Sequence, residues 1–395
     1  MPRPKPKPAR VQPPDRTNVA GIVWVFLRLG ATAFGGPAAH VALMRHEFVR
    51  RRAWLDDRRF MDLLGVTQLI PGPNSTEMAM HVGYLRAGWR GLVGAGVGFI
   101  LPAALLVTAF AWAYAGYAAT PQLKWLLYGV RPVVIAVVAH AVLGLARASV
   151  RPWPMLAVAV GVAVPALLGV SELALLAAGA AAGAGAKLAV ARNWPARLDG
   201  WAWLAPLVGP SALAVASATP FTLLGLALTF LKIGAVLYGS GYVLVAFLRG
   251  EFVLRLGWLT ETQVLDAIAI GQVTPGPLFT SATFVGYVLG GFGGAAIATA
   301  AIFAPSFAFV AATAPFVARL RRSPLAGALL DGVNAAALGL MASATALLGR
   351  QSIVDVLTAL TAVAALVVLW RWRLSSIWLI AAGGMVGLVA RVLGG

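Results

Sequence analysis

Two repeated proline-glycine motifs carry the residue types in this sequence that are best suited to binding an anion. One reads Pro71-Gly72-Pro73 and the other Pro275-Gly276-Pro277. Proline is favoured at the first position of a helix and glycine permits a tight turn, so a helix is expected to begin just after each motif. The free amides and positive dipole end of such a helix attract anions, although a simple helix kink is the alternative interpretation. The neighbouring side chains that would add neutral donors are Asn74, Ser75, Thr76, Thr280 and Ser281.

Three basic residues, Arg28, Arg131 and Lys232, lie inside otherwise apolar stretches. A cation in hydrocarbon costs at least about 2.5–3.5 kcal/mol and usually marks a pathway or a partner. We interpret Arg28 and Lys232 as a pair of charges that faces a bound anion, with snorkelling of Arg28 to the interface as the alternative. Arg131 aligns with Asn334 in the internal repeat described below, and we interpret both as substrate contacts. A structural ion pair with Asp331 is the competing interpretation of Arg131.

Glu77 is an acidic residue in a region otherwise suited to anions. Burial disfavours the charged form of a carboxyl group, so Glu77 is predicted to carry a proton that couples transport to a proton gradient. Pairing with Arg28 or His81 is the alternative. We expect the histidines of the helical stretches to be satisfied structural residues, and they are His40, His81 and His140. The chain contains no cysteine, which excludes disulfides, thiolate metal sites and iron–sulfur clusters, and we expect no cofactor or metal.

An internal repeat organises these residues. At an offset of 204, residues 26–77 align with residues 230–281, with 20 of 52 positions identical, including both Pro-Gly-Pro motifs. Charged and proline matches in one register are not produced by shared apolar composition, so the chain consists of one unit written twice. After a one-residue gap, Pro102 aligns with Pro305 and Gly129 with Gly332. The predicted domains are a basic disordered tail at 1–18, one repeat at 19–190, a linker with a connecting helix at 191–219, and a second repeat at 220–395.

Apolar runs of about 20 residues predict the membrane spans. Two stretches of the first half are interrupted, 19–44 at Phe34-Gly35-Gly36-Pro37 and 63–88 at Pro71-Gly72-Pro73. Broken backbone inside a membrane survives only where protein or water satisfies it, so these stretches are expected to be discontinuous or re-entrant helices that line a cavity. The uninterrupted spans are expected at 91–118, 121–146, 152–170, 172–190, 293–318, 324–349, 352–370 and 374–391, with a connecting helix at 201–218.

Composition places the whole chain in a bilayer. Of its 395 residues, 60% are hydrophobic and only 11% are charged, and the mean hydropathy is +0.85. The net charge of +18 comes from basic residues that lie mostly at the ends of apolar segments, where they meet lipid head groups, so nucleic-acid binding is not expected. The distribution of Lys and Arg favours a cytosolic N-terminus. An odd connecting helix then makes the two repeats inverted with respect to each other, which predicts an all-α polytopic fold.

The sequence resembles the chromate ion transporter family in its long two-domain form, from about residue 19 to residue 391. The motifs that carry the resemblance are Phe34-Gly35-Gly36-Pro37, the loop from Glu47-Phe48-Val49 to Trp54-Leu55, both Pro-Gly-Pro motifs, Gly83-Tyr84, Gly234, Gly286-Tyr287 and Gly332-Val333-Asn334. The second half departs from the pattern, since Gly239-Ser240-Gly241 replaces Gly-Gly-Pro and Leu278-Phe279 replaces Asn-Ser. This half is expected to bind less strongly or to act as a gate.

The resemblance implies export of chromate from the cytosol across the inner membrane, with resistance to chromate as the result. A chromate dianion is driven out of a cell that is negative inside, so the sequence predicts a secondary transporter that uses the membrane potential or a proton gradient, as an antiporter. The alternatives are a transporter of sulfate or another oxyanion, a channel and, less favoured, a membrane-embedded enzyme. The expected partners are the oxyanion and membrane lipid, and a second copy of the chain in a homodimer is the one protein partner considered.

Overall fold

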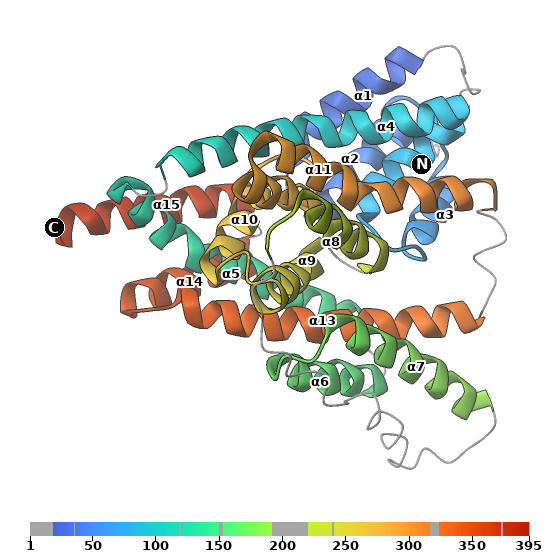
Figure 1. The fold of residues 1–395 in the computed structure, drawn as a ribbon. Helices are drawn as coiled ribbons and strands as arrows, with labels where there is room; N and C mark the ends of the chain where they lie inside the picture. The colour runs from blue at the N-terminus through green and yellow to red at the C-terminus, as the bar shows by residue number, and fades with distance from the viewer. Residues whose placement is uncertain are drawn as a thin grey trace, which may run out of the picture.

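The computed structural model describes residues 19–34, 36–117, 120–149, 153–191, 220–238, 241–316, 324–372 and 374–394. Every regular element in these ranges is a helix (Figure 1). Five of the helices are long and apolar enough to cross a bilayer, and shorter apolar helices accompany them. The expectation of an all-helical, polytopic membrane protein is therefore confirmed. Gly35, the basic tail and the connecting helix expected at 201–218 lie outside the described residues.

Both halves of the chain present the same order of elements. The first half contains α1 (Val19–Thr32), α2 (Gly36–Arg45), the π-helix η1 (His46–Arg51), α3 (Asp57–Thr67), α4 (Asn74–Tyr117), α5 (Pro121–Ser149), α6 (Trp153–Leu167) and α7 (Glu172–Ala191). The second half contains α8 (Leu223–Val236), η4 (Gly241–Val243), α9 (Leu244–Leu248), the π-helix η5 (Arg249–Arg255), α10 (Glu261–Val273), η6 (Leu278–Thr280), α11 (Ser281–Thr313), η7 (Ala314–Phe316), α13 (Pro324–Ser352), α14 (Val356–Trp372) and α15 (Ser376–Gly394).

The interrupted stretches turn back on themselves instead of continuing in one direction. Phe48, which follows the break between α1 and α2, packs its ring 5.2 Å from the ring of Phe26 on α1. Their counterparts Phe230 and Phe252 are 4.9 Å apart in the second half. Each aromatic pair joins a residue before the break to one well after it, so the chain has returned toward the level at which it entered. The expected discontinuous helices are thus present in both halves.

A second reversal lies inside α4 and α11. The backbone leaves helical geometry at Ala87 and Gly88, where Gly88 has φ +58°, and at the equivalent Gly290 and Gly291, where Gly291 has φ +61°. A Cβ on Gly83 would collide with the backbone of Gly91. Residues eight apart on a straight helix are separated by about 12 Å along the axis, so this contact requires the chain to fold back as a helical hairpin. The short helix that begins after each Pro-Gly-Pro motif therefore ends at this turn.

The two halves are inverted with respect to each other. In the contact between α4 and α11, Leu92 shares a buried cluster with Val310, while Gly96 lies against the ring of Phe307. Residue numbers rise along one helix as they fall along the other, so these equivalent helices run antiparallel, side by side (Figure 1). The inverted-repeat arrangement expected from the sequence is confirmed by this crossing.

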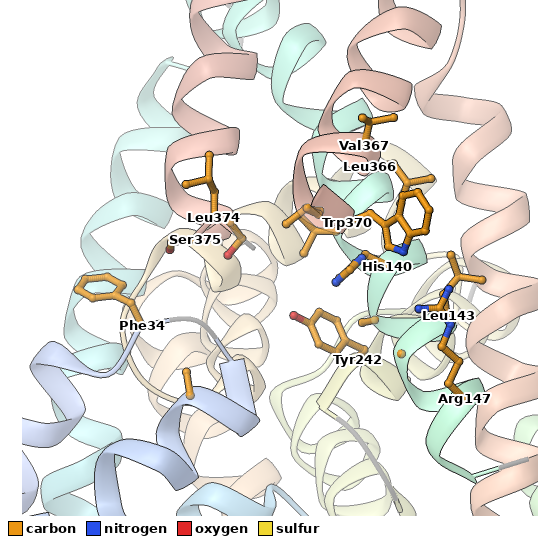
Figure 2. A pocket seen from close by; sticks show the side chains of 16 residues that line it. Phe34, His140, Leu143, Arg147, Tyr242, Leu366, Val367, Trp370, Leu374 and Ser375 are labelled. Atoms are coloured by element: carbon orange, nitrogen blue, oxygen red, sulfur yellow. The ribbon is translucent and has the colours of Figure 1, made fainter. Parts of the chain in front are cut away.

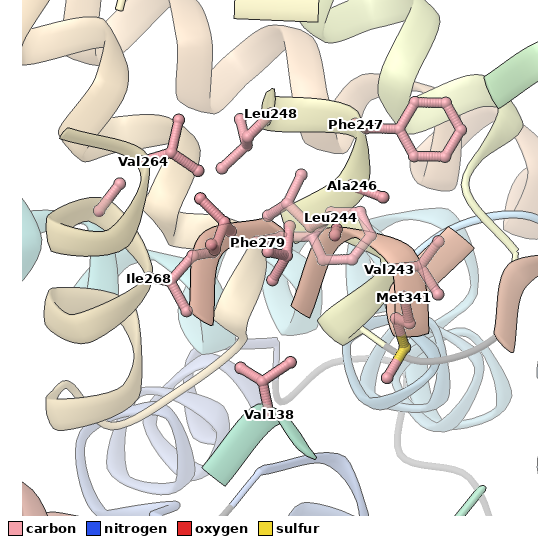
Figure 3. Close-up of a cluster of buried hydrophobic side chains, with 14 of the residues drawn as sticks. Val138, Val243, Leu244, Ala246, Phe247, Leu248, Val264, Ile268, Phe279 and Met341 are labelled. Atoms are coloured by element: carbon pink, nitrogen blue, oxygen red, sulfur yellow. The ribbon is translucent and has the colours of Figure 1, made fainter. Parts of the chain in front are cut away.

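Small residues and a large apolar cluster hold the helices together. Gly129 of α5 lies against the backbone of Gly383 in α15, and the equivalent Gly332 of α13 lies against Gly179 in α7. Such close approach of backbones is the usual way in which helices pack inside membranes. Figure 3 shows the centre of the largest cluster, where α9 packs against α10 and α13; its labelled residues include Leu244, Phe247, Leu248, Ile268, Phe279 and Met341.

Candidate functional site

The Pro-Gly-Pro motif of each half binds the helix break of the other half. The backbone N–H of Gly72 donates to the carbonyl of Leu237 at 2.8 Å, and the N–H of Gly276 donates to the carbonyl of Ala33 at 2.8 Å. Both residue pairs are equivalent at the offset of 204, so the two bonds are related by the inverted repeat. The helix η6 that follows the second motif also contacts α4 and η4, so the four breaks of the chain meet at one place, between the two halves.

Each glycine of these motifs is required by its backbone and by its neighbours. Gly72 has φ +135° and Gly276 has φ +91°, a region that side chains rarely adopt. A Cβ on Gly72 would collide with the carboxylate of Glu77 and the hydroxyl of Ser306, and a Cβ on Gly276 would crowd Ala103. The flanking prolines, Pro71 and Pro73, are adjacent to Gly72, and α4 begins at Asn74 as expected. In the second half the helix after Pro275 and Pro277 begins at Leu278 with a 3-10 turn.

Buried polar atoms without hydrogen-bond partners gather around the two motifs. Within the described ranges, this set includes Thr76 Oγ1, both carboxylate oxygens of Glu77, Gln272 Nε2, Ser281 Oγ and Ser306 Oγ. Buried polar groups in proteins are normally paired, and each unpaired one calls for an explanation such as a ligand or water. Ser281 Oγ lies against Gly271, and Ser306 Oγ lies against Gly72 beside Glu77. The centre of the molecule thus offers donors, together with one carboxyl group, that nothing in the described chain satisfies.

Glu77 is fully buried, with no exposed side-chain surface. Neither of its oxygens lies within hydrogen-bond distance of Arg28 or His81, so the alternative of a pair with either residue is wrong. Ser306, from the second half, lies beside Glu77 at Gly72. At the second motif, Ser281 stands at the position equivalent to Glu77, and Ala103 stands at the position equivalent to Ser306. The two halves of the centre are therefore chemically unequal.

The donors predicted around the motifs are partly used by the protein itself. Ser75 Oγ lies 3.3 Å from Nδ1 of His40, whose Nε2 is 3.0 Å from the carbonyl of Ala33. The hydroxyl of Thr280 donates to the carbonyl of Pro277 at 2.8 Å. His40 is the satisfied structural histidine that we expected, but His81 is not, because its Nε2 is buried without a partner in the described structure. Asn74 is half-buried at the start of α4, and Gly36 and Pro37 begin α2.

The two membrane cations are not free charges at the centre. Lys232 forms an ion pair with Glu251 of η5, and Glu251 also accepts from Arg255. In the first half the equivalent Glu47 is bound by Arg51 and Arg52, and Arg28 lies exposed on α1. The exposed position of Arg28 fits the snorkelling alternative. A role for either cation in anion binding stays a prediction.

Arg131 has a different partner from the one expected. Its Nε donates to Oδ1 of Asp266 at 2.8 Å and its Nη2 donates to Oδ2 at 2.9 Å, while the hydroxyl of Tyr114 donates to Oδ2 at 3.0 Å. The alternative of a pair with Asp331 is wrong, since Arg131 is bound to Asp266 and Asp331 is exposed on α13. Asp266 lies on α10, so this bond links the two halves. Asn334, the repeat counterpart of Arg131, is half-buried on α13.

A cavity of about 820 Å³ opens beside this centre. Figure 2 shows His140, Leu143 and Arg147 following one another along α5, with Tyr242 across the cavity. Phe34 and the junction of α14 with α15 complete its wall. Sequence reasoning missed Ser306, Gln272, Tyr242 and Arg147 as candidate site residues. The sequence could have indicated two of them. Ser306 follows Pro305, which aligns with Pro102, and Gln272 is identical to Gln68 in the repeat.

Comparison with known proteins identifies the family. The model of the chromate transporter family matches residues 20–184 and 224–388, which are the two repeats. The chromate transport protein of Cupriavidus metallidurans is 33% identical over 96% of this chain and 98% of its own length. The probable chromate transport protein of Synechococcus elongatus is 34% identical over 88% of each chain, and that of Pseudomonas aeruginosa, named a chromate transport protein, is 32% identical over 92% of this chain and 90% of its own. No solved structure matches the chain significantly. With its two inverted repeats and unpaired polar centre, the chain belongs to the chromate transporter family and is a membrane transporter and not an enzyme.

Proposed function

We propose that this protein exports chromate from the cytosol by alternating access, with the anion bound where the two Pro-Gly-Pro motifs meet. The observation that carries the proposal is the pair of reciprocal bonds, Gly72 to Leu237 and Gly276 to Ala33, which brings both motifs to one place. The helices that start there direct their free amides and positive dipole ends toward the same region. Inverted repeats with broken helices at the midplane are the architecture of many secondary transporters.

The chemistry of the centre suits a tetrahedral oxyanion. Such an anion presents four oxygens that accept hydrogen bonds, and the unpaired groups around the motifs include the hydroxyls of Thr76, Ser281 and Ser306 and the amide of Gln272. Hydrogen bonds to a charged acceptor are stronger than those between neutral groups, so a few such donors can hold a desolvated anion. Chromate and sulfate share this shape and charge, and sulfate is the substrate that competition must test.

The membrane potential supplies the driving force. A dianion that leaves a cell negative inside gains about 4.6 kcal/mol per 100 mV, twice the value for one charge. We place the protein in the inner membrane with its N-terminus in the cytosol, because the basic residues then lie mostly on the cytosolic side. Loss of chromate resistance in cells that express Lys232→Ala would support a role for that cation in the pathway.

Glu77 is proposed to couple the anion to protons. A bare carboxylate beside a bound dianion would repel it, so the anion and a proton on Glu77 favour each other's binding. Release of the anion then releases the proton on the same side, so this coupling is cotransport and replaces the antiport that the sequence suggested. With its proton the anion moves one net negative charge, for which the membrane potential supplies about 2.3 kcal/mol per 100 mV, and flux depends on the pH difference across the membrane. Ser306, which lies beside Glu77, is the group that would hold the protonated carboxyl in position.

Proteoliposomes loaded with chromate test both parts of the proposal. Wild-type protein should carry chromate in a saturable way, and a pH gradient should change the rate. Glu77→Gln should keep chromate exchange but lose the response to pH, whereas Asp331→Asn, which neutralises an exposed acid on α13, should behave as wild type. Ser281→Ala should weaken chromate binding. Absence of chromate flux by wild-type protein, or flux of sulfate that chromate does not inhibit, would overturn the proposed substrate.

A further inference from the structure

The cavity beside the centre is lined by residues from the helix breaks of both halves of the chain. Its wall includes Phe34, at the break after α1, and Tyr242, at the equivalent break of the second half. The hydroxyl of Tyr242 lies 3.5 Å from the position that a Cβ on Gly36 would take. The inner end of the cavity therefore reaches the region in which the four breaks meet.

At two of the positions that line this cavity, the repeat counterparts are packed in the described structure. Ala39 of α2 lines the cavity, but its counterpart Val243 is only 1% exposed in the apolar cluster of α9. His140 lines the cavity as well, whereas its counterpart Ser343 is 5% exposed and donates to the carbonyl of Leu340. The same elements are thus open in one half and packed in the other.

The turn between the paired helices explains the difference. Ser376, at the start of α15, lines the open cavity. Its counterpart Glu172, at the start of α7, lies instead against Gly250, where any Cβ would collide with its carboxylate. The α6–α7 turn therefore covers the second half at a place where the α14–α15 turn leaves the first half open. This one-sided opening is what a transporter shows in one of its two access states.

The open cavity carries basic residues and hydroxyls on an otherwise apolar wall. His140 and Arg147 are seven residues apart on α5, which places them on the same face of the helix about 10 Å apart. Tyr242, Ser375 and Ser376 add hydroxyl groups, and no acidic residue lines the cavity in the described part of the chain. A narrow space with charge of one sign and apolar walls raises the local concentration of the opposite ion.

We infer that this cavity is the entry vestibule for a tetrahedral oxyanion, and that Arg147 and His140 are the residues that recruit it. The inference rests on the proposed function and adds to it a second, outer anion site on α5. Arg147 binds the anion first, because its planar guanidinium matches two oxygens at once. His140 is half-buried whereas Arg147 is exposed, so the anion passes from Arg147 to His140 as it enters.

The absence of cysteine from the chain permits a clean labelling test. Gly144 lines the cavity, and a Cβ there meets no atom within 4 Å, so Gly144→Cys is expected to fold. Its repeat counterpart, Leu347→Cys, is the matched control on the closed side. In proteoliposomes, Gly144→Cys should react faster with an anionic than with a cationic methanethiosulfonate, after correction for a free thiol, and sulfate should slow the reaction. Sulfate is used because chromate would oxidise the thiol.

Substitution of Arg147 provides the second part of the test. Arg147→Gln in the Gly144→Cys background should remove the preference for the anionic reagent. In transport, Arg147→Gln should raise KM about fivefold, which is about 1 kcal/mol, and leave kcat unchanged. The matched control is Arg350→Gln, the exposed counterpart on α13. Labelling that ignores reagent charge, or an unchanged KM with normal wild-type flux, overturns the vestibule. Failure of the proposed substrate is recognised separately, by wild-type protein that carries no chromate.

Discussion

Removal of the Asp266 carboxylate should destabilise the protein strongly, because it leaves Arg131 as an unpaired cation inside the helix bundle. Asp266 is fully buried and accepts two bonds from Arg131 and one from Tyr114. Breaking a buried ion pair by removing one partner costs about 3–5 kcal/mol. Since 25% of the Arg131 side chain is exposed, Asp266→Ala is expected at the lower end, about 3 kcal/mol. For 395 residues, an unfolding entropy of about 2.1 cal/mol/K per residue converts this loss into a fall of about 4 °C in Tm.

Thermal unfolding of purified protein in detergent measures this change. Asp331→Ala, which removes an exposed carboxylate from α13, should leave Tm unchanged. The double variant with Arg131→Met and Asp266→Leu removes both charges and should recover most of the stability. An Asp266→Ala variant as stable as the wild type would refute the structural role of the pair. A double variant that is stable but carries no chromate would instead assign Arg131 to the substrate, as the sequence first suggested.

Two further substitutions test packing and capping. Gly332→Ala should lower stability by about 1–3 kcal/mol, because its Cβ would enter the backbone of Gly179, while Gly327→Ala in the same helix meets no atom within 4 Å and should be neutral or slightly stabilising. Asp355→Ala should cost about 1 kcal/mol at pH 7, because Asp355 Oδ1 accepts from the N–H of Thr358 at the start of α14. The bond from the Thr358 N–H, and that from the hydroxyl of Tyr128, hold the pKa of Asp355 below its usual value. Its stabilisation is therefore present above pH 4 and should disappear as the pH falls through the lowered pKa, which unfolding curves at several pH values would show.

The repeat made most of the fold predictable. Once Pro71-Gly72-Pro73 was aligned with Pro275-Gly276-Pro277, the breaks, the helices that follow them and the inversion could all be stated, and the structure has them. Apolar length then located the spans to within a few residues, as at Pro121–Ser149 for an expected 121–146. These features depend on local chemistry and on the number of crossings, which a sequence records directly.

Partners of the charged residues were harder to predict, because they depend on how the halves meet. Arg131 was interpreted as a substrate contact, with a pair to Asp331 of α13 as the alternative, but its partner is Asp266 of α10. Lys232 was interpreted as a free cation, yet Glu251 lies 19 positions away and is brought to it by the return of the chain after the break. A side chain's position along a helix does not reveal which helix crosses it. The repeat nevertheless held a hint, since Glu47 and Glu251 match in register while Arg28 and Lys232 do too.

The pairing of Lys232 changes how a transport site for a dianion should be understood. The unpaired atoms around the two motifs belong to hydroxyl, amide and carboxyl groups in the described structure, while Lys232 and Arg131 are occupied by carboxylates. Opposite charges in a dry interior attract so strongly that a fixed cation would slow release of a dianion. Conduction requires a site that is favourable enough to enter and weak enough to leave. Dipoles at the centre and the full charge of Arg147 in the outer cavity separate release of the anion from its attraction. A variant that adds a cation at Ser281 should therefore bind the anion more tightly and carry it more slowly.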